Sequence, residues 1–171
     1  MVIWLCGLSG AGKSTIGAEV YTRLKAQRPN LVMLDGDELR EALGGSIGHD
    51  PNSRILNSIR IANLCHLLDR QGIDVICCAV TIAPDAQKSN RERLSYYREV
   101  YLKVSLDVLK GRDPKGIYER AMRGETLNVA GVDIPVIEPD APHIVIDNNH
   151  DTDDVSAMVD RIVENLPSRA A

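Results

Sequence analysis

Phenylalanine is absent from this sequence of 171 residues, and one tryptophan and five tyrosines make up its whole aromatic content of 4%. A pocket that stacks a base on phenylalanine rings is therefore excluded. No apolar run approaches the roughly 18 residues that a membrane span requires. The net charge of −4 provides no basic field for nucleic acid or for an anionic membrane. We expect no nucleic-acid partner, no membrane attachment and a cytoplasmic location.

Cysteine is also scarce. The sequence has four cysteines, and their spacing fits neither a metal site nor a disulfide framework, so we expect reduced thiols in the core. Cys77 and Cys78 are neighbours in a predicted strand and should point to opposite faces of the sheet. The apolar start, residues 2–6, leads directly into a glycine-rich stretch. We interpret it as the first strand and not as a removable signal peptide.

The glycine-rich stretch reads GLSGAGKS over residues 7–14, which is the spacing of a phosphate-binding P-loop. A strand before it and a helix after it favour this interpretation over a chance glycine-rich turn. Backbone N–H groups and the N-terminus of the helix would face the phosphates of ATP. Lys13 would act in catalysis by reaching the β- and γ-phosphates, and Ser14 would hold Mg²⁺. The predicted nucleotide-binding residues are Gly7, Ser9, Gly10, Ala11, Gly12, Lys13, Ser14 and Thr15.

Hydrophobic patterning predicts strands that alternate with helices along the chain. Apolar runs predict strands over residues 2–6, 30–34, 73–80, 100–104 and 143–147. Helical patterns cover residues 15–27, 51–70, 84–97, 106–110 and a last segment that residues 152–154 cap. The fold class is therefore α/β, a three-layer P-loop NTPase fold with a five-stranded parallel sheet. We expect residues 1–171 to form a single domain with a lid-like segment over about 112–142, because its turn-rich part over residues 124–142 is too long for a simple connection.

Two carboxylates, Asp35 and Asp37, follow the strand predicted over residues 30–34. In open parallel sheets, ligands bind beyond the carboxyl ends of the strands. Asp35 can hold a Mg²⁺-bound water, and Asp37 can orient an acceptor hydroxyl and take its proton. A surface turn is the alternative for an Asp-Gly step, but the position beside a P-loop favours catalysis.

Basic and amide side chains follow at helical spacing. Arg40 lies three residues after the second carboxylate, and Arg54 and Asn57 are also three apart, so each pair shares one side of a helix. Such a face suits an anionic acceptor with ribose hydroxyls. At the start of the lid segment, a cation could close on the triphosphate or stack on a base. We expect Arg112 to contact ATP there and Lys115 to contact the acceptor.

Four parts of the sequence together resemble the adenylylsulfate kinase family. They are the P-loop, the Leu34–Asp37 segment, the Arg54-x-x-Asn57 pair and the RDPKGIY segment over residues 112–118. The resemblance runs in order and spacing from residue 2 to about residue 147. That family transfers the γ-phosphoryl group of MgATP to the 3′-hydroxyl of adenosine 5′-phosphosulfate, and its members are commonly dimers. The resemblance implies a base at Asp37 and a lid residue at Lys115. It also implies acceptor contacts from Arg40, Arg54 and Asn57, with ATP and Mg²⁺ as cofactors, a nucleotide as small-molecule partner and a homodimer.

The departures from the family pattern lie in the acceptor pocket. The family holds adenine between two phenylalanines, and this sequence has His49 and Val129 at those positions, which we therefore count among the acceptor-binding residues. Base–aromatic stacking contributes about 1–3 kcal/mol per base, so adenine binding should be weaker by well over tenfold. The family's Asn-Ile-Arg-Arg reads NSIR over residues 57–60, its Ile-Ser-Pro step reads VTI over 80–82, and Pro84 replaces an arginine. The ATP half of the pattern is kept and the acceptor half is altered.

Several functions stay open. Adenylylsulfate kinase activity is the default, and a cytidine diphosphoramidate kinase of capsule pathways is the alternative within the family, because cytosine needs a smaller stacking surface. The missing phenylalanines favour a non-adenine acceptor. A nucleotide-binding regulator without turnover is disfavoured because Lys13 and Asp37 are retained and a guanine-reading Asn-Lys-x-Asp is missing. A sugar or shikimate kinase is disfavoured by the Arg54-x-x-Asn57 pair and by residues 112–118.

Overall fold

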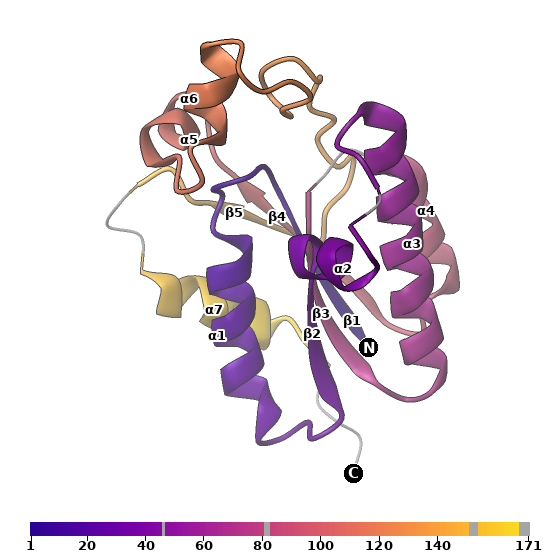
Figure 1. Ribbon diagram of the computed structural model, residues 1–171. Helices are drawn as coiled ribbons and strands as arrows, with labels where there is room; N and C mark the ends of the chain where they lie inside the picture. The colour runs from indigo at the N-terminus through magenta and orange to yellow at the C-terminus, as the bar shows by residue number, and fades with distance from the viewer. Residues whose placement is uncertain (46, 81–82, 151–153, 168–171) are drawn as a thin grey trace.

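A parallel β-sheet forms the middle layer of the molecule (Figure 1). The computed structural model describes residues 1–45, 47–80, 83–150 and 154–167. Within these ranges the sheet has five strands in the order β2-β3-β1-β4-β5. The strands are β1 (Val2–Cys6), β2 (Leu31–Asp35), β3 (Asp74–Ala79), β4 (Tyr97–Lys103) and β5 (Ile144–Asp147). Every neighbouring pair is parallel, so the predicted α/β fold with a five-stranded parallel sheet is confirmed.

Helices cover both faces of this sheet. They are α1 (Lys13–Lys25), α2 (Gly36–Ala42), α3 (Pro51–Arg70), α4 (Pro84–Arg93), α5 (Leu106–Arg112), α6 (Ile117–Met122) and α7 (Val155–Glu164). Figure 1 shows α1 and α7 on one face and α3 and α4 on the other, which confirms the three layers. The segment from α5 to β5 lies above the carboxyl ends of the strands. In the described part of the chain, no helix combines the length and the apolar composition needed to cross a membrane.

Local sequence signals determine where the helices begin. Asp50 caps α3 by accepting a hydrogen bond from the backbone three residues on, and Pro51 is the first helical residue, as predicted. Asp154 caps α7 in a similar way. The other predicted capping residues of that helix, Thr152 and Asp153, lie outside the described residues.

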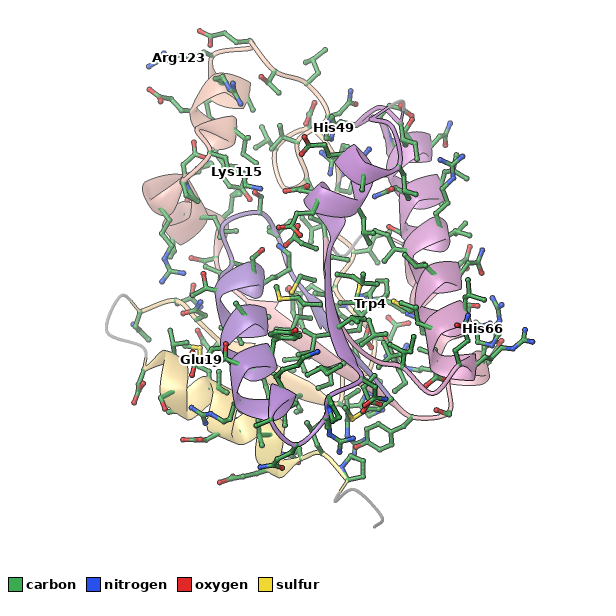
Figure 2. All side chains as sticks on the ribbon, turned by 60° about the horizontal axis from the view of Figure 1, so that its bottom comes forward. Trp4, Glu19, His49, His66, Lys115 and Arg123 are labelled. Atoms are coloured by element: carbon green, nitrogen blue, oxygen red, sulfur yellow. The ribbon has the colours of Figure 1, made fainter. Side chains whose placement is uncertain are left out.

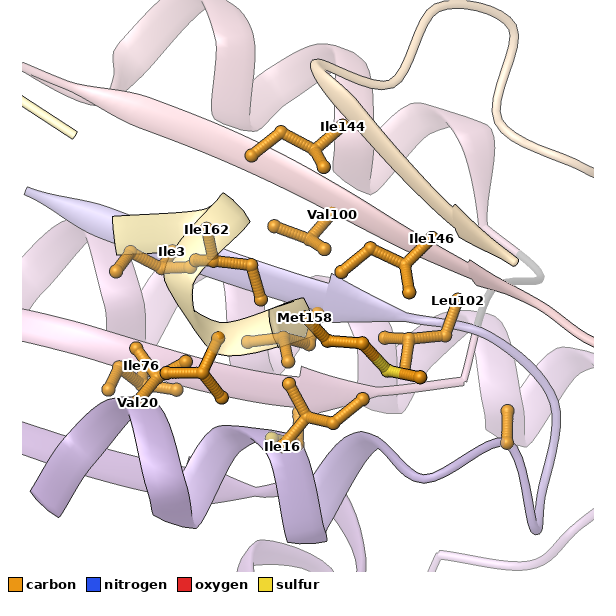
Figure 3. Close-up of a cluster of buried hydrophobic side chains, with 14 of the residues drawn as sticks. Ile3, Ile16, Val20, Ile76, Val100, Leu102, Ile144, Ile146, Met158 and Ile162 are labelled. Carbon is orange, nitrogen blue, oxygen red and sulfur yellow. The ribbon is translucent and has the colours of Figure 1, made fainter. Parts of the chain in front are cut away.

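An aliphatic core lies between the sheet and the helices α1 and α7 (Figure 3). Ile16 and Val20 of α1 and Met158 and Ile162 of α7 pack on side chains of the strands. Burying one such side chain contributes about 1.5–3 kcal/mol. The strand residues in this core are Ile3, Ile76, Val100, Leu102, Ile144 and Ile146.

The opposite face of the sheet packs on α3 and α4. Trp4 and Cys77 belong to this second core, whereas Cys78 belongs to the core under α1, so the two neighbouring thiols point to opposite faces as predicted. The four cysteines, all within the described residues, are buried, and none of them forms a disulfide. Burial raises the pKa of the Cys78 thiol to about 12. The Cys78 thiol therefore fills the core as a neutral group.

The boundary between α4 and β4 differs from the prediction. The helix predicted over residues 84–97 ends at Arg93, and β4 begins at Tyr97, three residues before the predicted strand. Glu99 lies inside β4, fully buried, and forms an ion pair with Arg91. A charged residue within the strand hides it from a search for apolar runs, and the predicted helix end is wrong for that reason.

Candidate functional site

The P-loop joins β1 to α1 through glycines that no other residue could replace without strain. Gly7 has a φ of 149° and Gly12 a φ of 93°, which side chains rarely tolerate. A Cβ on Gly7 would lie 2.7 Å from the carbonyl oxygen of Leu102, and one on Gly12 would lie 2.9 Å from Nδ2 of Asn148. Asn148 also donates a hydrogen bond to the carbonyl of Ala11 at 3.0 Å. The loop is therefore packed closely against β4 and the segment after β5.

The polar side chains of the P-loop face the carboxyl end of β2. The ammonium group of Lys13 donates to the carbonyl of Leu8 at 2.7 Å, and burial lowers its pKa. The hydroxyl of Ser14 donates to Oδ2 of Asp35 at 2.5 Å. This pair of oxygen donors fits Mg²⁺, which takes few protein ligands and completes its shell with water and phosphate. Among the described residues, no three His, Cys, Asp or Glu side chains form a metal cluster, so a metal here would depend on such outside ligands.

A cavity of about 740 Å³ lies between the P-loop, α2 and the lid segment. Figure 2 shows Lys115 on its α5–α6 side and His49 on the side of the segment between α2 and α3. Predicted donor-side and acceptor-side residues thus line one cavity, although their roles stay predictions. Those that line it are Ser9, Gly10, Gly12, Lys13, Ser14, Thr15, Asp35, Asp37, Arg40, His49, Arg54, Lys115 and Val129.

The remaining predicted site residues lie elsewhere. Gly7 and Ala11 form the back of the P-loop and pack against the sheet. Asn57 lines a smaller chamber of about 50 Å³ beside the main cavity. Arg112 donates to the carbonyl of Asn148 at 2.8 Å, which joins α5 to the segment after β5. The structure therefore places Arg112 at the edge of the P-loop region and outside the lining of the cavity.

Asp37 lies in the first turn of α2, directly after β2. Asp35 caps this helix by accepting a hydrogen bond from the backbone N–H of Asp37 at 2.9 Å. The ammonium group of Lys115 reaches across from the lid segment and forms an ion pair with the Asp37 carboxylate. Burial acts to raise the pKa of Asp37, but the hydrogen bond and charge of Lys115, with Lys13 and Arg40, hold it below its ordinary value. Asp37 is therefore ionised and already paired.

Two arginines hold the predicted acceptor side of the cavity in shape. Arg40 donates from Nη1 to both carbonyls of the 47–48 segment, each at 2.7 Å. Arg54 donates from Nε to the carbonyl of His49 at 2.7 Å and from Nη2 to the carbonyl of Asn128 at 2.6 Å. Arg54 therefore links the α3 side of the cavity to the lid side.

The lid wall around Asn128 is a tight loop. Asn128 has a φ of 66°, in the left-handed region that non-glycine residues rarely adopt. The carboxylate of Asp133 accepts hydrogen bonds from the backbone N–H groups of Asn128 and Val129, both at 2.5 Å. These bonds, together with the one from Arg54, determine where Val129 faces the cavity.

The wall of the cavity has little aromatic surface. None of the described residues that line it is phenylalanine, tyrosine or tryptophan, and His49 supplies a ring there. Burial and the charges of Arg40 and Arg54 lower the pKa of His49, so its imidazole is neutral at pH 7. A neutral ring and a small aliphatic Val129 in the lining of one cavity offer a modest stacking surface.

The cavity also contains residues that the sequence did not predict. Arg120 and Ile117 both line the cavity and are three apart on α6, so they share one side of this helix. A search for further cations in the lid segment could have found Arg120. Asn128 carries no local signal, because its place depends on Arg54 and Asp133. The lining residues without a prediction are Gly36, Cys78, Ala79, Val80, Pro114, Ile117, Arg120, Thr126, Leu127, Asn128 and Ala130.

Comparison with known proteins shows which protein family this chain belongs to. The family model of adenylylsulphate kinase matches residues 1–147. The chain belongs to the adenylylsulphate kinase family. The cytidine diphosphoramidate kinase of Campylobacter jejuni subsp. jejuni serotype O:2 is 38% identical over 165 residues, with 96% of this chain and 95% of that protein covered. The adenylyl-sulfate kinase of Clostridium kluyveri is 39% identical over 167 residues, with 97% and 83% covered.

Solved structures agree with this family. The APS kinase of Mycobacterium tuberculosis, in complex with AMPPNP and APS, has a TM-score of 0.83 and 26% identity, with 95% of each chain covered. The shikimate kinase of Aquifex aeolicus has a TM-score of 0.57 and 17% identity, with 96% of this chain and 94% of that chain covered, which shows the shared fold alone. As a member of the adenylylsulphate kinase family, the chain is a phosphotransferase with a P-loop kinase fold. The resemblance drawn from the sequence motifs is confirmed.

Proposed function

We propose that this member of the adenylylsulphate kinase family transfers the γ-phosphoryl group of MgATP to the ribose 3′-hydroxyl of a nucleotide acceptor. The observation that carries the proposal is the shared cavity, in which Asp37 at the end of β2 faces Lys13 and Ser14 of the P-loop. A carboxylate beside a P-loop is the pair of groups that phosphoryl transfer to a hydroxyl needs.

Each group then has a distinct role. The P-loop N–H groups, the N-terminus of α1 and Lys13 hold the transferred phosphate and the charge that develops on it. Ser14 would bind Mg²⁺ directly, and Asp35 would hold it through a bound water. The metal would neutralise charge on the β- and γ-phosphates. Asp37 orients the acceptor hydroxyl and receives its proton, once the hydroxyl has taken the place of Lys115.

The acceptor that the cavity favours is cytidine diphosphoramidate. The lining has a neutral His49 and Val129 where a purine would need broad aromatic stacking, and a pyrimidine needs less surface. The similarity of 38% to a cytidine diphosphoramidate kinase supports this choice. Adenosine 5′-phosphosulfate is the second candidate, because an adenylyl-sulfate kinase is 39% identical.

A panel of acceptors tests the proposal. We expect ATP-dependent phosphorylation of cytidine diphosphoramidate with a kcat/KM above that for adenosine 5′-phosphosulfate. In the variant His49→Phe, a ring suited to stacking returns, and kcat/KM for the adenine acceptor should rise by about tenfold. His66→Phe, on the outer side of α3 (Figure 2), is the control and should leave kcat/KM for both acceptors unchanged. A wild-type preference for the adenine acceptor would reverse our choice of acceptor, and failure to phosphorylate any nucleotide would refute the proposal itself.

Further expectations belong to the proposal. Use of ATP as donor is consistent with the predicted cytoplasmic location, where ATP is abundant. Three expectations stay predictions: the homodimer, the single domain over residues 1–171 and the closing of its lid segment. The mass in solution would test the homodimer, and nucleotide-dependent motion in solution would test the closing of the lid segment.

A further inference from the structure

The small chamber of about 50 Å³ beside the main cavity has its own chemistry. Three residues of α3 line the chamber alone, and the rest of its lining is shared with the main cavity. Those of α3 are Asn57, Ser58 and Ile61, and the shared ones are Gly36, Asp37, Arg40, His49, Arg54, Ala79 and Val80. A water molecule occupies about 30 Å³ in the liquid, so the chamber holds one small group and no base. It therefore suits the terminal group of an acceptor whose base lies in the larger cavity.

Ser58 presents only a hydrogen-bond acceptor to this chamber. Its side chain is buried, with 8% of the residue exposed, and its hydroxyl donates to the carbonyl of Arg54 at 3.0 Å. A hydroxyl has one proton and two lone pairs. Because the proton is committed to the helix backbone, the oxygen can receive an N–H or O–H group from a ligand and cannot offer one.

Asn57 leaves a buried polar atom unsatisfied in the same wall. The residue is 6% exposed, and its Oδ1 has no hydrogen-bond partner among the residues that the structure describes. An unpaired buried amide oxygen costs about 1–3 kcal/mol. A ligand that brings hydrogen-bond donors into the chamber would give this amide a partner and recover that cost.

The arginines in the chamber wall require a different property of the ligand. Arg40 and Arg54 are cations, and Nε of Arg40 is buried without a partner among the described residues. Guanidinium groups bind phosphoryl oxygens well. The chamber thus combines donors for an anionic oxygen with acceptors for an N–H group.

We propose that this chamber is a subsite for an amidated terminal phosphoryl group, with Ser58 accepting a hydrogen bond from its P–NH₂ nitrogen. This inference rests on the proposed function and adds the group that the site recognises. Arg40 and Arg54 bind the phosphoryl oxygens, and the amide of Asn57 lies beside the same nitrogen. A sulfate group carries oxygens alone, so it would bring an acceptor against the oxygen of Ser58.

The test compares two acceptors that differ at one atom. Cytidine diphosphoramidate has a nitrogen where cytidine diphosphate has an oxygen, and isothermal titration calorimetry in the presence of MgADP gives both dissociation constants without turnover. We expect the wild-type protein to bind the amidate more tightly. The preference is the dissociation constant for the diphosphate divided by that for the amidate. In Ser58→Ala, this ratio should fall by about five- to tenfold, the contribution of one hydrogen bond.

Thr22→Ala is the matched control. Thr22 makes the same kind of bond on α1, from its hydroxyl to the carbonyl of Ala18 four residues before it, at 2.9 Å. This variant should leave the ratio unchanged. An equal ratio in wild type and Ser58→Ala, or a wild-type protein that binds neither acceptor, would overturn the subsite. If the ratio depends on Ser58 but ATP gives no phosphorylated product, the proposed function fails and the subsite stands.

Discussion

Under the proposed function, the donor side and the acceptor side of the cavity are built from different parts of the chain. On the donor side, one continuous segment over residues 7–14 supplies backbone N–H groups, and glycines such as Gly12 give it its shape. On the acceptor side, α2, α3 and the lid segment meet, and side chains such as Arg54 and Lys115 hold them together. A backbone site tolerates little change in sequence, whereas a site held by side chains can take a new ligand through a few substitutions.

That difference explains where this sequence departs from its family pattern. The P-loop is intact, and the departures fall on residues such as His49, Ser58 and Val129, which contribute side chains to the acceptor walls. Replacing any of them leaves the backbone bonds of the donor side in place. Predictions that act on one side at a time can break or sharpen this comparison.

The largest effect is expected at Asp37. The variant Asp37→Asn removes the base and should lower kcat by about 10²–10⁴-fold, with the KM for ATP unchanged. Steady-state kinetics with both substrates measure the two constants. Glu38→Gln, on the exposed neighbour in α2, is the control and should keep normal turnover. Near-normal turnover of Asp37→Asn would refute the assignment of the base.

A loss of about 10²–10³-fold in kcat is expected for Lys13→Ala, which acts on the donor side. The acceptor should bind as before, because the Arg40 and Arg54 bonds do not involve Lys13. Calorimetry with the acceptor alone measures this, and Lys88→Ala on the exposed side of α4 is the control. If acceptor affinity fell along with turnover, the two sides would not be independent.

A smaller effect, on acceptor binding alone, is expected for Arg54→Lys. Lysine keeps the charge but cannot bond the carbonyls of His49 and Asn128 together. The acceptor KM should rise by about tenfold or more, the contribution of charged hydrogen bonds, with the KM for ATP unchanged. Arg60→Lys, exposed on the same helix, should leave both constants as they are. An equal rise in the KM for ATP would contradict a role confined to the acceptor side.

The smallest effect concerns stability. The side chains of Asp37 and Lys115 are 67% and 58% exposed, so Lys115→Gln should change the free energy of unfolding at pH 7 by less than about 1 kcal/mol. The pKa of Asp37 is lowered from 3.8, so the pair stabilises the folded state above that pH. Its contribution is lost as the pH falls through the lowered pKa.

Urea unfolding of wild type and Lys115→Gln between pH 3 and 7 measures this difference. The exposed pair of Lys103 and Glu138, with Nζ and Oε2 at 3.4 Å, is the matched case, and Lys103→Gln should behave alike at pH 7. A loss of several kcal/mol from Lys115→Gln would mean that the lid segment contributes to the core stability of the protein.

The P-loop and much of the fold could be predicted from the sequence because their signals are local. The P-loop spacing, the Asp50-Pro51 helix start and the apolar strands each lie within a few neighbouring residues. The start of β4 could not be found in this way, since Glu99 breaks the apolar run and its partner Arg91 lies on α4.

Much of the acceptor side was beyond prediction for a similar reason. Arg54 and Lys115 were found as cations, but the partners that they meet on the opposite wall were not, because those bonds join segments far apart in the chain. The carbonyl of Asn128 receives Arg54 across 74 positions, and Lys115 meets Asp37 across 78. Long-range bonds of this kind carry no pattern that neighbouring residues reveal.

The ion pair between Lys115 and Asp37 has a consequence for unwanted hydrolysis. Under the proposed roles, a water molecule that enters the site before the acceptor finds the carboxylate occupied by a cation. Such a water is poorly activated, since a carboxylate held by an ammonium group is a weak base. The nucleotide acceptor, with several groups bound along the cavity, can displace Lys115 where a single water cannot. Lys115 would then suppress ATP hydrolysis until the nucleotide acceptor is bound.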